Sequence, residues 1–410
     1  MYRSLVFALL AAFLILGGCG DKASNPESDK PRPVTETEEQ LVDSFNRFGL
    51  DLFKELVRGE RDENVFVSPL SVSMALGMTY NGAAGTTEEA MRNTLKFDDL
   101  TLEQINGAYR SLIDLLGSLD PDVQFQLANS IWYRMGVTFR QDFIDRNQIY
   151  FNAEVRGLDF SAPEAAATIN DWVSENTGDR IEDIVSDPID PMTVMFLINA
   201  IYFKGSWTYE FDTEETEDDV FMLPGGVEAP CRMMNQAGDF MYFRGMGFQA
   251  IDLPYGNGDF SMVVILPDRP KNDIDSIIDA LDQETWIGWL ESFDEQEGHI
   301  QLPKFTLEYE AMLNKVLTAL GMGVAFDMGA ADFSGMYSGP QRLFISKVKH
   351  KSFVTVDEEG TEAAAATSVE VGITSPTGFR MRVDHPFLFA IRDSHTQTIL
   401  FMGKIVEPLL

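Results

Sequence analysis

Histidines are the side chains most often used for acid–base catalysis and metal binding, and this chain has four: His299, His350, His385 and His395. No two form a His-x-x-x-His pair, and the chain has two cysteines far apart, so the spacing of a structural zinc site is missing. A Gly-x-Ser-x-Gly turn, a Gly-rich phosphate loop and a zinc-protease helix are missing as well. The sequence therefore predicts no metal and no cofactor, and it offers an enzyme no nucleophile motif.

The charge balance excludes another class of function. The chain carries 65 acidic and 31 basic residues, a formal net charge of −34, and 45% of its residues are hydrophobic. Such a negative field repels nucleic acid and anionic lipid, while the apolar fraction is that of a folded globular protein. We therefore expect no nucleic-acid partner, and acidic runs such as residues 214–219 are expected to be solvated.

The segment "EEGTEAAAATSVEVG" (358–372) has an unusual composition for a globular chain. Read as a strand, its odd positions from Thr361 to Val371 are all uncharged and small or β-branched, whereas its even positions include Glu362 and Glu370. This pattern predicts a strand with one face on a core. An alanine-rich helix end that runs into an edge strand is the alternative on composition alone.

Helix signals dominate the first half of the chain. Ser68 is expected to cap a helix that Pro69 starts, and Thr86 with Glu89 is expected to form a capping box for the next helix.

Strand signals dominate the second half. Residues 194–205 are a near-continuous apolar run, residues 248–267 suggest two strands joined by a Gly-Asn-Gly turn, and residues 385–408 suggest a C-terminal hairpin. The sequence thus predicts an α+β fold with large antiparallel sheets.

The N-terminus has the features of a secretory signal. Residues 1–18 combine an early arginine with a short apolar core, and "LGGC" resembles a bacterial lipobox in which Cys19 becomes lipid-modified. An ordinary secretory signal with an incidental Cys19 is the alternative. Residues 19–40 are expected to be a disordered acidic tether and residues 41–410 a single domain, in which Cys231 is a small buried hydrophobe.

Many separate motifs in the body occur in the order that they have in the serpin family. They are "FVSPLSVSMALGM" (66–78), "NGAAGTTEEAM" (81–91), "INDWVSENTGDRI" (169–181), "FLINAIYFKGSW" (196–207), "LPKFTLEYEAMLNKVLTALGM" (302–322), the stretch "VKHKSFVTVDEEGTEAAAATSVEVG" (348–372), "DHPFLFAIRD" (384–393) and "ILFMGKIVEP" (399–408). The chain resembles serpins over nearly all of residues 41–410. This resemblance implies three β-sheets, about nine helices and an exposed reactive-centre loop at about 358–384.

The resemblance also implies a function, that of a single-use protease inhibitor. In inhibitory serpins a protease cleaves the loop, the freed segment inserts as a new strand into the large sheet, and the protease is trapped as an acyl-enzyme. Counting from Gly360 places the scissile bond at Thr374–Ser375, with Ile373 as the neighbouring position because the chain has one extra residue before "HPF". These side chains fit a small apolar primary pocket, as in elastase-like or subtilisin-like serine proteases.

The family's conformational machinery can be carried over residue by residue. The inhibitory-type hinge comprises Glu359, Gly360, Thr361, Glu362, Ala363, Ala364, Ala365 and Ala366. The shutter under the opening sheet comprises Ser68, Ser71, Asn199 and His350, and the breach at its top comprises Trp207, Lys304 and Glu359. A Lys304–Glu359 pair is expected to hold the uninserted state closed.

Three functions remain open from the sequence. The first is an inhibitory serpin, monomeric and lipid-anchored outside the cytoplasm to a bacterial membrane. The second is a non-inhibitory serpin that acts as a binding or chaperone-like module, and the third is an uncharacterised hydrolase. Heparin-type activation is not expected, because residues 96–122 contain only Lys96 and Arg110 as basic side chains.

Overall fold

A computed structural model describes residues 31–268, 273–340, 342–361 and 378–409. Within these ranges the chain forms nine α-helices. They are α1 (Glu36–Gly59), α2 (Pro69–Tyr80), α3 (Gly85–Thr94), α4 (Leu102–Leu116), α5 (Gln141–Phe151), α6 (Ala165–Asn176), α7 (Ile274–Asp279), α8 (Gln283–Leu290) and α9 (Asn314–Leu317).

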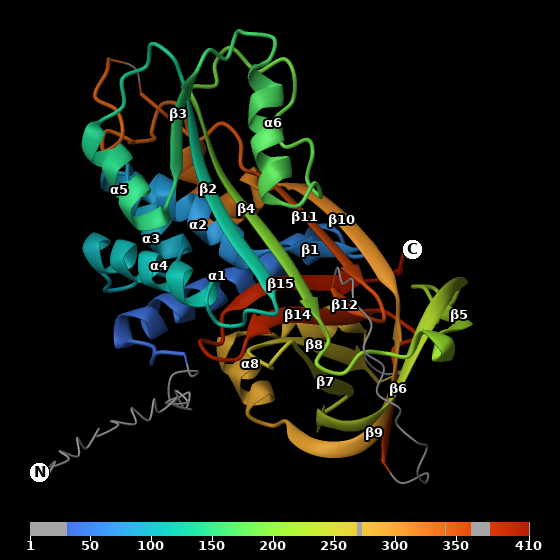
Figure 1. Ribbon diagram of the computed structural model, residues 1–410. Helices are drawn as coiled ribbons and strands as arrows, with labels where there is room; N and C mark the ends of the chain where they lie inside the picture. The colour runs from blue at the N-terminus through green and yellow to red at the C-terminus, as the bar shows by residue number, and fades with distance from the viewer. Residues whose placement is uncertain (1–30, 269–272, 341, 362–377, 410) are drawn as a thin grey trace, which may run out of the picture.

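The first sheet has six strands in the order β10-β11-β12-β4-β2-β3. Their bounds are β2 (Gln124–Arg134), β3 (Glu154–Leu158), β4 (Met195–Ser206), β10 (Phe305–Met312), β11 (Lys349–Val356) and β12 (Gly360–Thr361). Helix α6 packs on β2 and β4 on one face, while α2 packs on β4 from the core side (Figure 1).

The second sheet has nine strands in the order β1-β15-β14-β8-β7-β6-β9-β13, with β5 also paired to β6. Their bounds are β1 (Val65–Val67), β5 (Glu217–Met222), β6 (Glu228–Arg244), β7 (Phe248–Tyr255), β8 (Phe260–Pro267), β9 (Asp294–Pro303), β13 (Phe379–Arg382), β14 (Phe387–Asp393) and β15 (Ile399–Ile405). The long β6 pairs with β5 and β9 along most of its length and with β7 at its end, so it joins two of the three expected sheets. The predicted α+β fold with large antiparallel sheets is confirmed in the described residues.

Most of the local expectations are confirmed as well. The Ser68 side chain accepts a hydrogen bond from the Ser71 amide and caps α2, with Pro69 at its first position. The apolar run at 194–205 forms β4, and the two predicted hairpins are β7–β8 and β14–β15.

The start of α3 differs from the prediction. The helix begins at Gly85 after an extended Ala84, and no side chain caps it, so the Thr86–Glu89 capping box is wrong. The chain is held here by a distant segment, because the Ala84 amide donates to the Asp332 carbonyl. Tertiary hydrogen bonding has replaced the local cap.

The tether also ends earlier than expected. Residues 36–40 were predicted to be disordered, but they form the first turns of α1, which the Thr35 and Glu38 side chains open with a capping box. Arg32 pairs with Glu38 and donates to the Ser111 hydroxyl at 2.8 Å. Composition alone predicted disorder, whereas these specific contacts fix the arm on the body.

Cys231 is 3% exposed, and burial raises the pKa of its thiol to about 11, as expected for a small buried side chain. In the described residues, no helix combines the length and the apolar character needed to cross a membrane.

Candidate functional site

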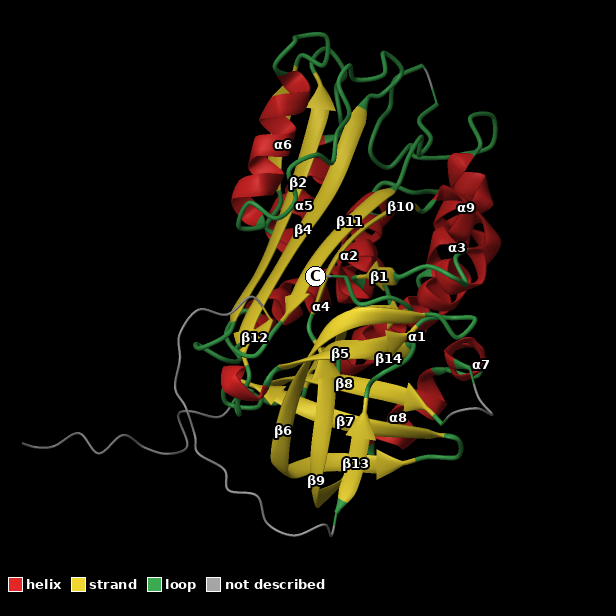
Figure 2. Cartoon of the chain, turned by 90° about the vertical axis from the view of Figure 1, so that its right-hand side faces the viewer, coloured by secondary structure: helices red, strands yellow, loops and turns green. Residues whose placement is uncertain are grey.

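The short strand β12 occupies one end of the space between β4 and β11 (Figure 2). Gly360 pairs with Ser206, and Thr361 pairs with both Gly205 on β4 and Val356 on β11. In the described part of the chain, β4 and β11 are each hydrogen-bonded to β12 and not to each other. We call the space between β4 and β11 beyond Thr361 the slot; among the described residues, no backbone ladder joins its two edges.

Gly360 is required by the turn that leads into β12. Its φ is +150°, and a Cβ atom at this position would collide with the carbonyl oxygen of Gly205. The Asp357 amide donates to the Gly360 carbonyl at 3.0 Å and closes the turn. Glycine therefore lets the chain reverse from β11 and enter the slot.

Thr361 faces the protein core, as the strand pattern predicted for the odd positions. Its side chain is 2% exposed, and its hydroxyl lies 2.6 Å from the hydroxyl of Tyr255. Tyr255 stacks on Trp207 with ring centroids 4.4 Å apart, and the Trp207 indole donates to the Asp357 carbonyl at 3.0 Å. These stacked aromatic rings contact Thr361, the last described residue of the hinge, and Asp357 in the turn before it.

The acidic partner of Lys304 is Glu358, not Glu359. Lys304 Nζ lies 2.5 Å from Glu358 Oε2, and the Thr216 hydroxyl donates to Glu358 Oε1 at 2.8 Å. Burial alone would raise the pKa of Glu358. The hydrogen bonds that its carboxylate accepts, first of all from Lys304, outweigh burial, so the pKa is lowered. Glu359 takes part through its backbone, because its carbonyl accepts from the Trp207 amide.

The four predicted shutter residues form one hydrogen-bonded cluster near the end of β11 that lies away from β12. The Ser68 amide donates to Nε2 of His350 at 3.2 Å, and the Ser71 hydroxyl donates to the Asn199 carbonyl at 3.4 Å. Burial lowers the pKa of His350 to about 4, so its imidazole is neutral at pH 7. The cluster links α2 to both strands that border the slot.

Asn199 has an incomplete set of partners. Its Nδ2 donates to Asn129 Oδ1 at 2.8 Å, whereas its Oδ1 is buried and has no partner among the described residues. A buried amide oxygen without a hydrogen bond is costly, so this atom marks a place where a donor can be accommodated.

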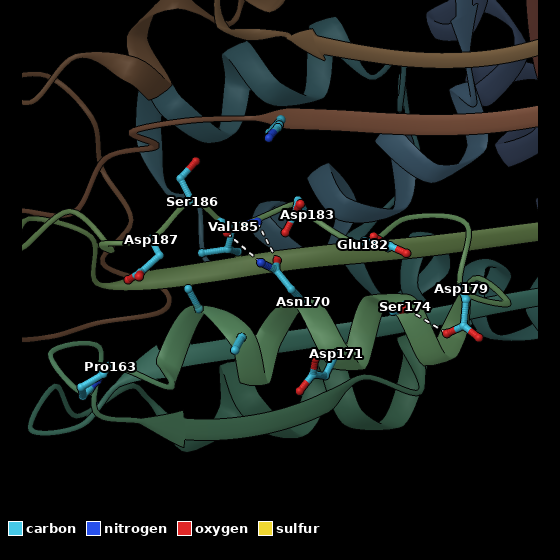
Figure 3. Close-up of a pocket in the computed structure, with 13 residues that line it drawn as sticks. Pro163, Asn170, Asp171, Ser174, Asp179, Glu182, Asp183, Val185, Ser186 and Asp187 are labelled. Carbon is cyan, nitrogen blue, oxygen red and sulfur yellow. Dashed lines mark hydrogen bonds between the residues drawn. The ribbon is translucent and has the colours of Figure 1, made fainter.

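A pocket of about 700 Å³ lies between α6, the loop that follows it and β11 (Figure 3). Its lining residues are Pro163, Ala166, Ala167, Asn170, Asp171, Ser174, Asp179, Glu182, Asp183, Val185, Ser186, Asp187 and Lys349. Asn170 donates to the Val185 carbonyl at 2.9 Å, and Ser174 donates to Asp179 at 2.9 Å, so these polar groups hold the loop on the helix. None of these lining residues is a histidine or a cysteine, the side chains that most often supply a general base or an activated nucleophile.

Metal chemistry has no site in the described ranges, where no group of three or more His, Cys, Asp or Glu residues is placed to hold an ion. Several expected site residues lie outside the described residues. They are Cys19, Glu362, Ala363, Ala364, Ala365, Ala366, Ile373, Thr374 and Ser375.

Sequence reasoning missed two members of the site. Glu358 continues the alternation of β11, in which His350, Ser352, Val354 and Val356 are buried, so counting in steps of two would have found it. Tyr255 had no such signal, because its contact with Thr361 joins residues 106 positions apart.

Comparison with known proteins agrees with this geometry. The family model described as Serpin (serine protease inhibitor) matches residues 43–408. An uncharacterised serpin-like protein of Thermococcus kodakarensis is 34% identical, with 99% of each chain covered. The leukocyte elastase inhibitor of Bos taurus is 38% identical, with 90% of this chain and all of the relative covered.

Solved structures show the same architecture. The thermophilic serpin tengpin in its native state superposes with a TM-score of 0.83 at 31% identity, covering 92% of this chain and 97% of tengpin. Human thyroxine-binding globulin in complex with its ligand also has a TM-score of 0.83, at 26% identity, covering 91% of this chain and all of the globulin. With the family model spanning nearly the whole described body, the chain belongs to the serpin family.

Proposed function

We propose that the protein is a suicide-substrate inhibitor of a serine protease, in which the cleaved reactive loop enters the slot between β4 and β11. The observation that carries this proposal is β12. Gly360 and Thr361 already lie in the sheet as the start of a new strand, and β4 and β11 beyond them are not paired with each other in the described chain.

The side chains that border the slot match the loop sequence in size. If the register of β12 continues, Ala363 arrives opposite Phe203 and Val354, and Ala365 arrives opposite Ile201 and Ser352. Phe203 and Ile201 are 5% and 7% exposed and already fill the core side of β4. Because this side of β4 is already filled, only small side chains such as alanine can enter beside it without overpacking the core, which is destabilising.

The polar groups match as well. The same register brings Thr367 opposite both Asn199 and His350, which are polar. The Thr367 hydroxyl can then donate to Asn199 Oδ1, which has no partner in the described structure. Thr367 at this position, with alanines at the inward positions 363 and 365, supports the proposal that the loop enters the slot from Thr361 onward.

The chemistry of trapping follows from ordinary serine-protease catalysis. The protease serine attacks the carbonyl carbon of Thr374, the Thr374–Ser375 bond breaks, and the protonated amine of Ser375 leaves. Insertion of about a dozen residues at ~3.4 Å each then moves the acyl-enzyme by roughly 40 Å. Each new ladder hydrogen bond contributes about 0.5–1.5 kcal/mol, and a displacement of about 1 Å in the distorted protease site slows deacylation roughly a hundredfold.

The expected target has a small apolar primary pocket. Ile373 and Thr374 carry neither a basic nor a large aromatic side chain. Relatives named leukocyte elastase inhibitor, from Xenopus laevis and Bos taurus, are 36% and 38% identical to this chain. An elastase-like or subtilisin-like protease is therefore the partner that we propose.

The test is a denaturing gel after the protein is mixed with pancreatic elastase or subtilisin. A band at the summed mass that survives boiling supports covalent trapping, and mass spectrometry of the released C-terminal peptide then assigns the scissile bond. Loop cleavage with continued turnover of every protease contradicts inhibition. That outcome favours a binding module, which is the role stated in the name of the similar thyroxine-binding globulin.

We also propose that Cys19 carries a lipid that anchors the protein outside the cytoplasm. The support is the "LGGC" sequence that ends the apolar leader. In a bacterial host, Cys19→Ser should move the protein from the membrane fraction to the soluble fraction. Retention in the membrane fraction would contradict a lipid on this residue.

A further inference from the structure

Tyr255 ends strand β7 directly beneath the hinge. Its side chain is fully buried, stacks on Trp207, and meets the edge of Phe203 with ring centroids 5.1 Å apart. With the ring packed in this way, the phenol hydroxyl points to Thr361. Its hydroxyl oxygen therefore has a fixed position at the entrance of the slot.

The only hydrogen-bond partner of this hydroxyl in the described chain is the hydroxyl of Thr361, at 2.6 Å. The pair is buried, since Thr361 is 2% exposed. A buried hydroxyl that loses its partner is costly, so withdrawal of Thr361 from the sheet would leave Tyr255 unsatisfied. The bond thus favours the state in which Thr361 lies in the sheet.

The same bond distinguishes between registers. A slip of one residue would turn every inward side chain of the entering strand outward. It would also place either Gly360, which has no side chain, or the charged Glu362 beside the Tyr255 hydroxyl. Thr361 is the only one of these three residues that can offer a neutral hydroxyl.

We propose that Tyr255 is a positioning residue for loop insertion, which holds Thr361 in the sheet and thereby sets the register in which the rest of the loop follows. This inference rests on the proposed inhibitory function. Tyr255 belongs to neither the predicted shutter nor the predicted breach. In this proposal it recognises the hydroxyl group of Thr361, not the size of its side chain.

The test uses the full-length protein with Tyr255→Phe, Thr361→Val and Thr361→Ser. After acylation, insertion competes with deacylation, so the ratio of turned-over to trapped inhibitor reports the insertion rate. Loss of one neutral hydrogen bond should raise this ratio roughly 2- to 10-fold in Tyr255→Phe and in Thr361→Val, with the acylation rate unchanged. Thr361→Ser keeps the hydroxyl and should behave as the wild type.

A double variant separates this role from general destabilisation. Tyr255→Phe combined with Thr361→Val should be no worse than either single change, because both remove the same bond. Tyr109→Phe is the matched control, since Tyr109 is also fully buried and its hydroxyl donates to the Ser73 carbonyl at 2.9 Å. The control should leave the ratio at the wild-type value.

Hydrogen exchange at residues 357–361 of the uncleaved protein gives a readout that needs no protease. Faster exchange in Tyr255→Phe than in Tyr109→Phe supports the inference, even if the wild type traps no protease and the inhibitory function itself fails. Unchanged exchange in Tyr255→Phe overturns the inference. So does a trapping ratio equal to that of the wild type, or a defect of Thr361→Ser as large as that of Thr361→Val.

Discussion

Substitution of Thr361 by arginine tests whether insertion depends on a buried first residue. Thr361 is 2% exposed and lies against the Tyr255 hydroxyl, opposite Gly205 and Val356. An arginine at this position must either keep the hinge out of the sheet or bring its charge into the core. Both outcomes oppose entry of the loop.

The size of the effect can be worked from this environment. Transfer of an unpaired ion into a protein interior costs several kcal/mol after relaxation, and we take about 4 kcal/mol. Because about 1.4 kcal/mol corresponds to a tenfold change in rate, insertion should slow by roughly a thousandfold. Deacylation then wins the competition, and Thr361→Arg should be a substrate.

The assay is the fraction of protease found in a boil-resistant complex at equal concentrations of protease and inhibitor. Thr361→Arg should yield only cleaved inhibitor, with loop cleavage as fast as in the wild type. The matched control is Glu362→Arg, because the strand pattern puts position 362 on the opposite face. Equal complex yields from Thr361→Arg and the wild type would refute the insertion argument. Loss of the boil-resistant complex in Glu362→Arg would refute the assignment of position 362 to the face opposite Thr361.

Three further predictions concern the hinge, the breach and the shutter. Gly360→Ala should weaken inhibition at least tenfold by the trapping assay, because the added Cβ collides with the Gly205 carbonyl and the φ of +150° is strained for alanine. Glu358→Gln should lower the free energy of unfolding in urea by about 1–3 kcal/mol, because Lys304 loses a charged hydrogen bond. His350 has a folded pKa of about 4, below its ordinary value of 6.5, so the unfolded state binds the proton first. The stability that neutral His350 provides is therefore complete above pH 6.5 and is lost as the pH falls towards 4, by about 3 kcal/mol in urea unfolding.

Each of these predictions has a matched control. Gly59→Ala adds a Cβ that meets nothing within 4 Å and should leave trapping unchanged. Glu359→Gln removes the neighbouring carboxylate, which is outside the Lys304 ion pair, and should shift stability by less than about 0.5 kcal/mol. His350→Gln should flatten the pH dependence between 4 and 6.5. Indistinguishable effects of Glu358→Gln and Glu359→Gln would contradict the assignment of the ion pair.

The sequence predicted the parts of the site that depend on local pattern. Alternation along residues 361–371 placed Thr361 on the core face, and the apolar run at 194–205 predicted the strand β4. The shutter came from family motifs, and the structure brings Ser68, Ser71 and His350 together as that resemblance implied.

The parts that the sequence did not predict depend on long-range geometry. The Lys304 partner is the exception: it was carried over from the family resemblance and was wrong by one residue, although the alternation of β11 points to Glu358. The contact between Tyr255 and Thr361 requires the relative placement of two sheets. The arm before α1 is held on the body by the ion pair between Arg32 and Glu38. The low hydrophobicity of this segment gave no sign of that specific contact.

In the described chain β4 and β11 are not paired with each other, and this has a consequence for how such a protein can be improved. Optimisation for thermal tolerance rewards any substitution that lets the two strands pair with each other or fills the space between them. Under the proposed function, each such substitution also closes the space that the loop must occupy, so screens that rank variants by melting temperature should enrich proteins that have lost this function. A more heat-resistant inhibitor has to be sought in positions that β4 and β11 do not share, such as the hydrogen-bonded arm before α1.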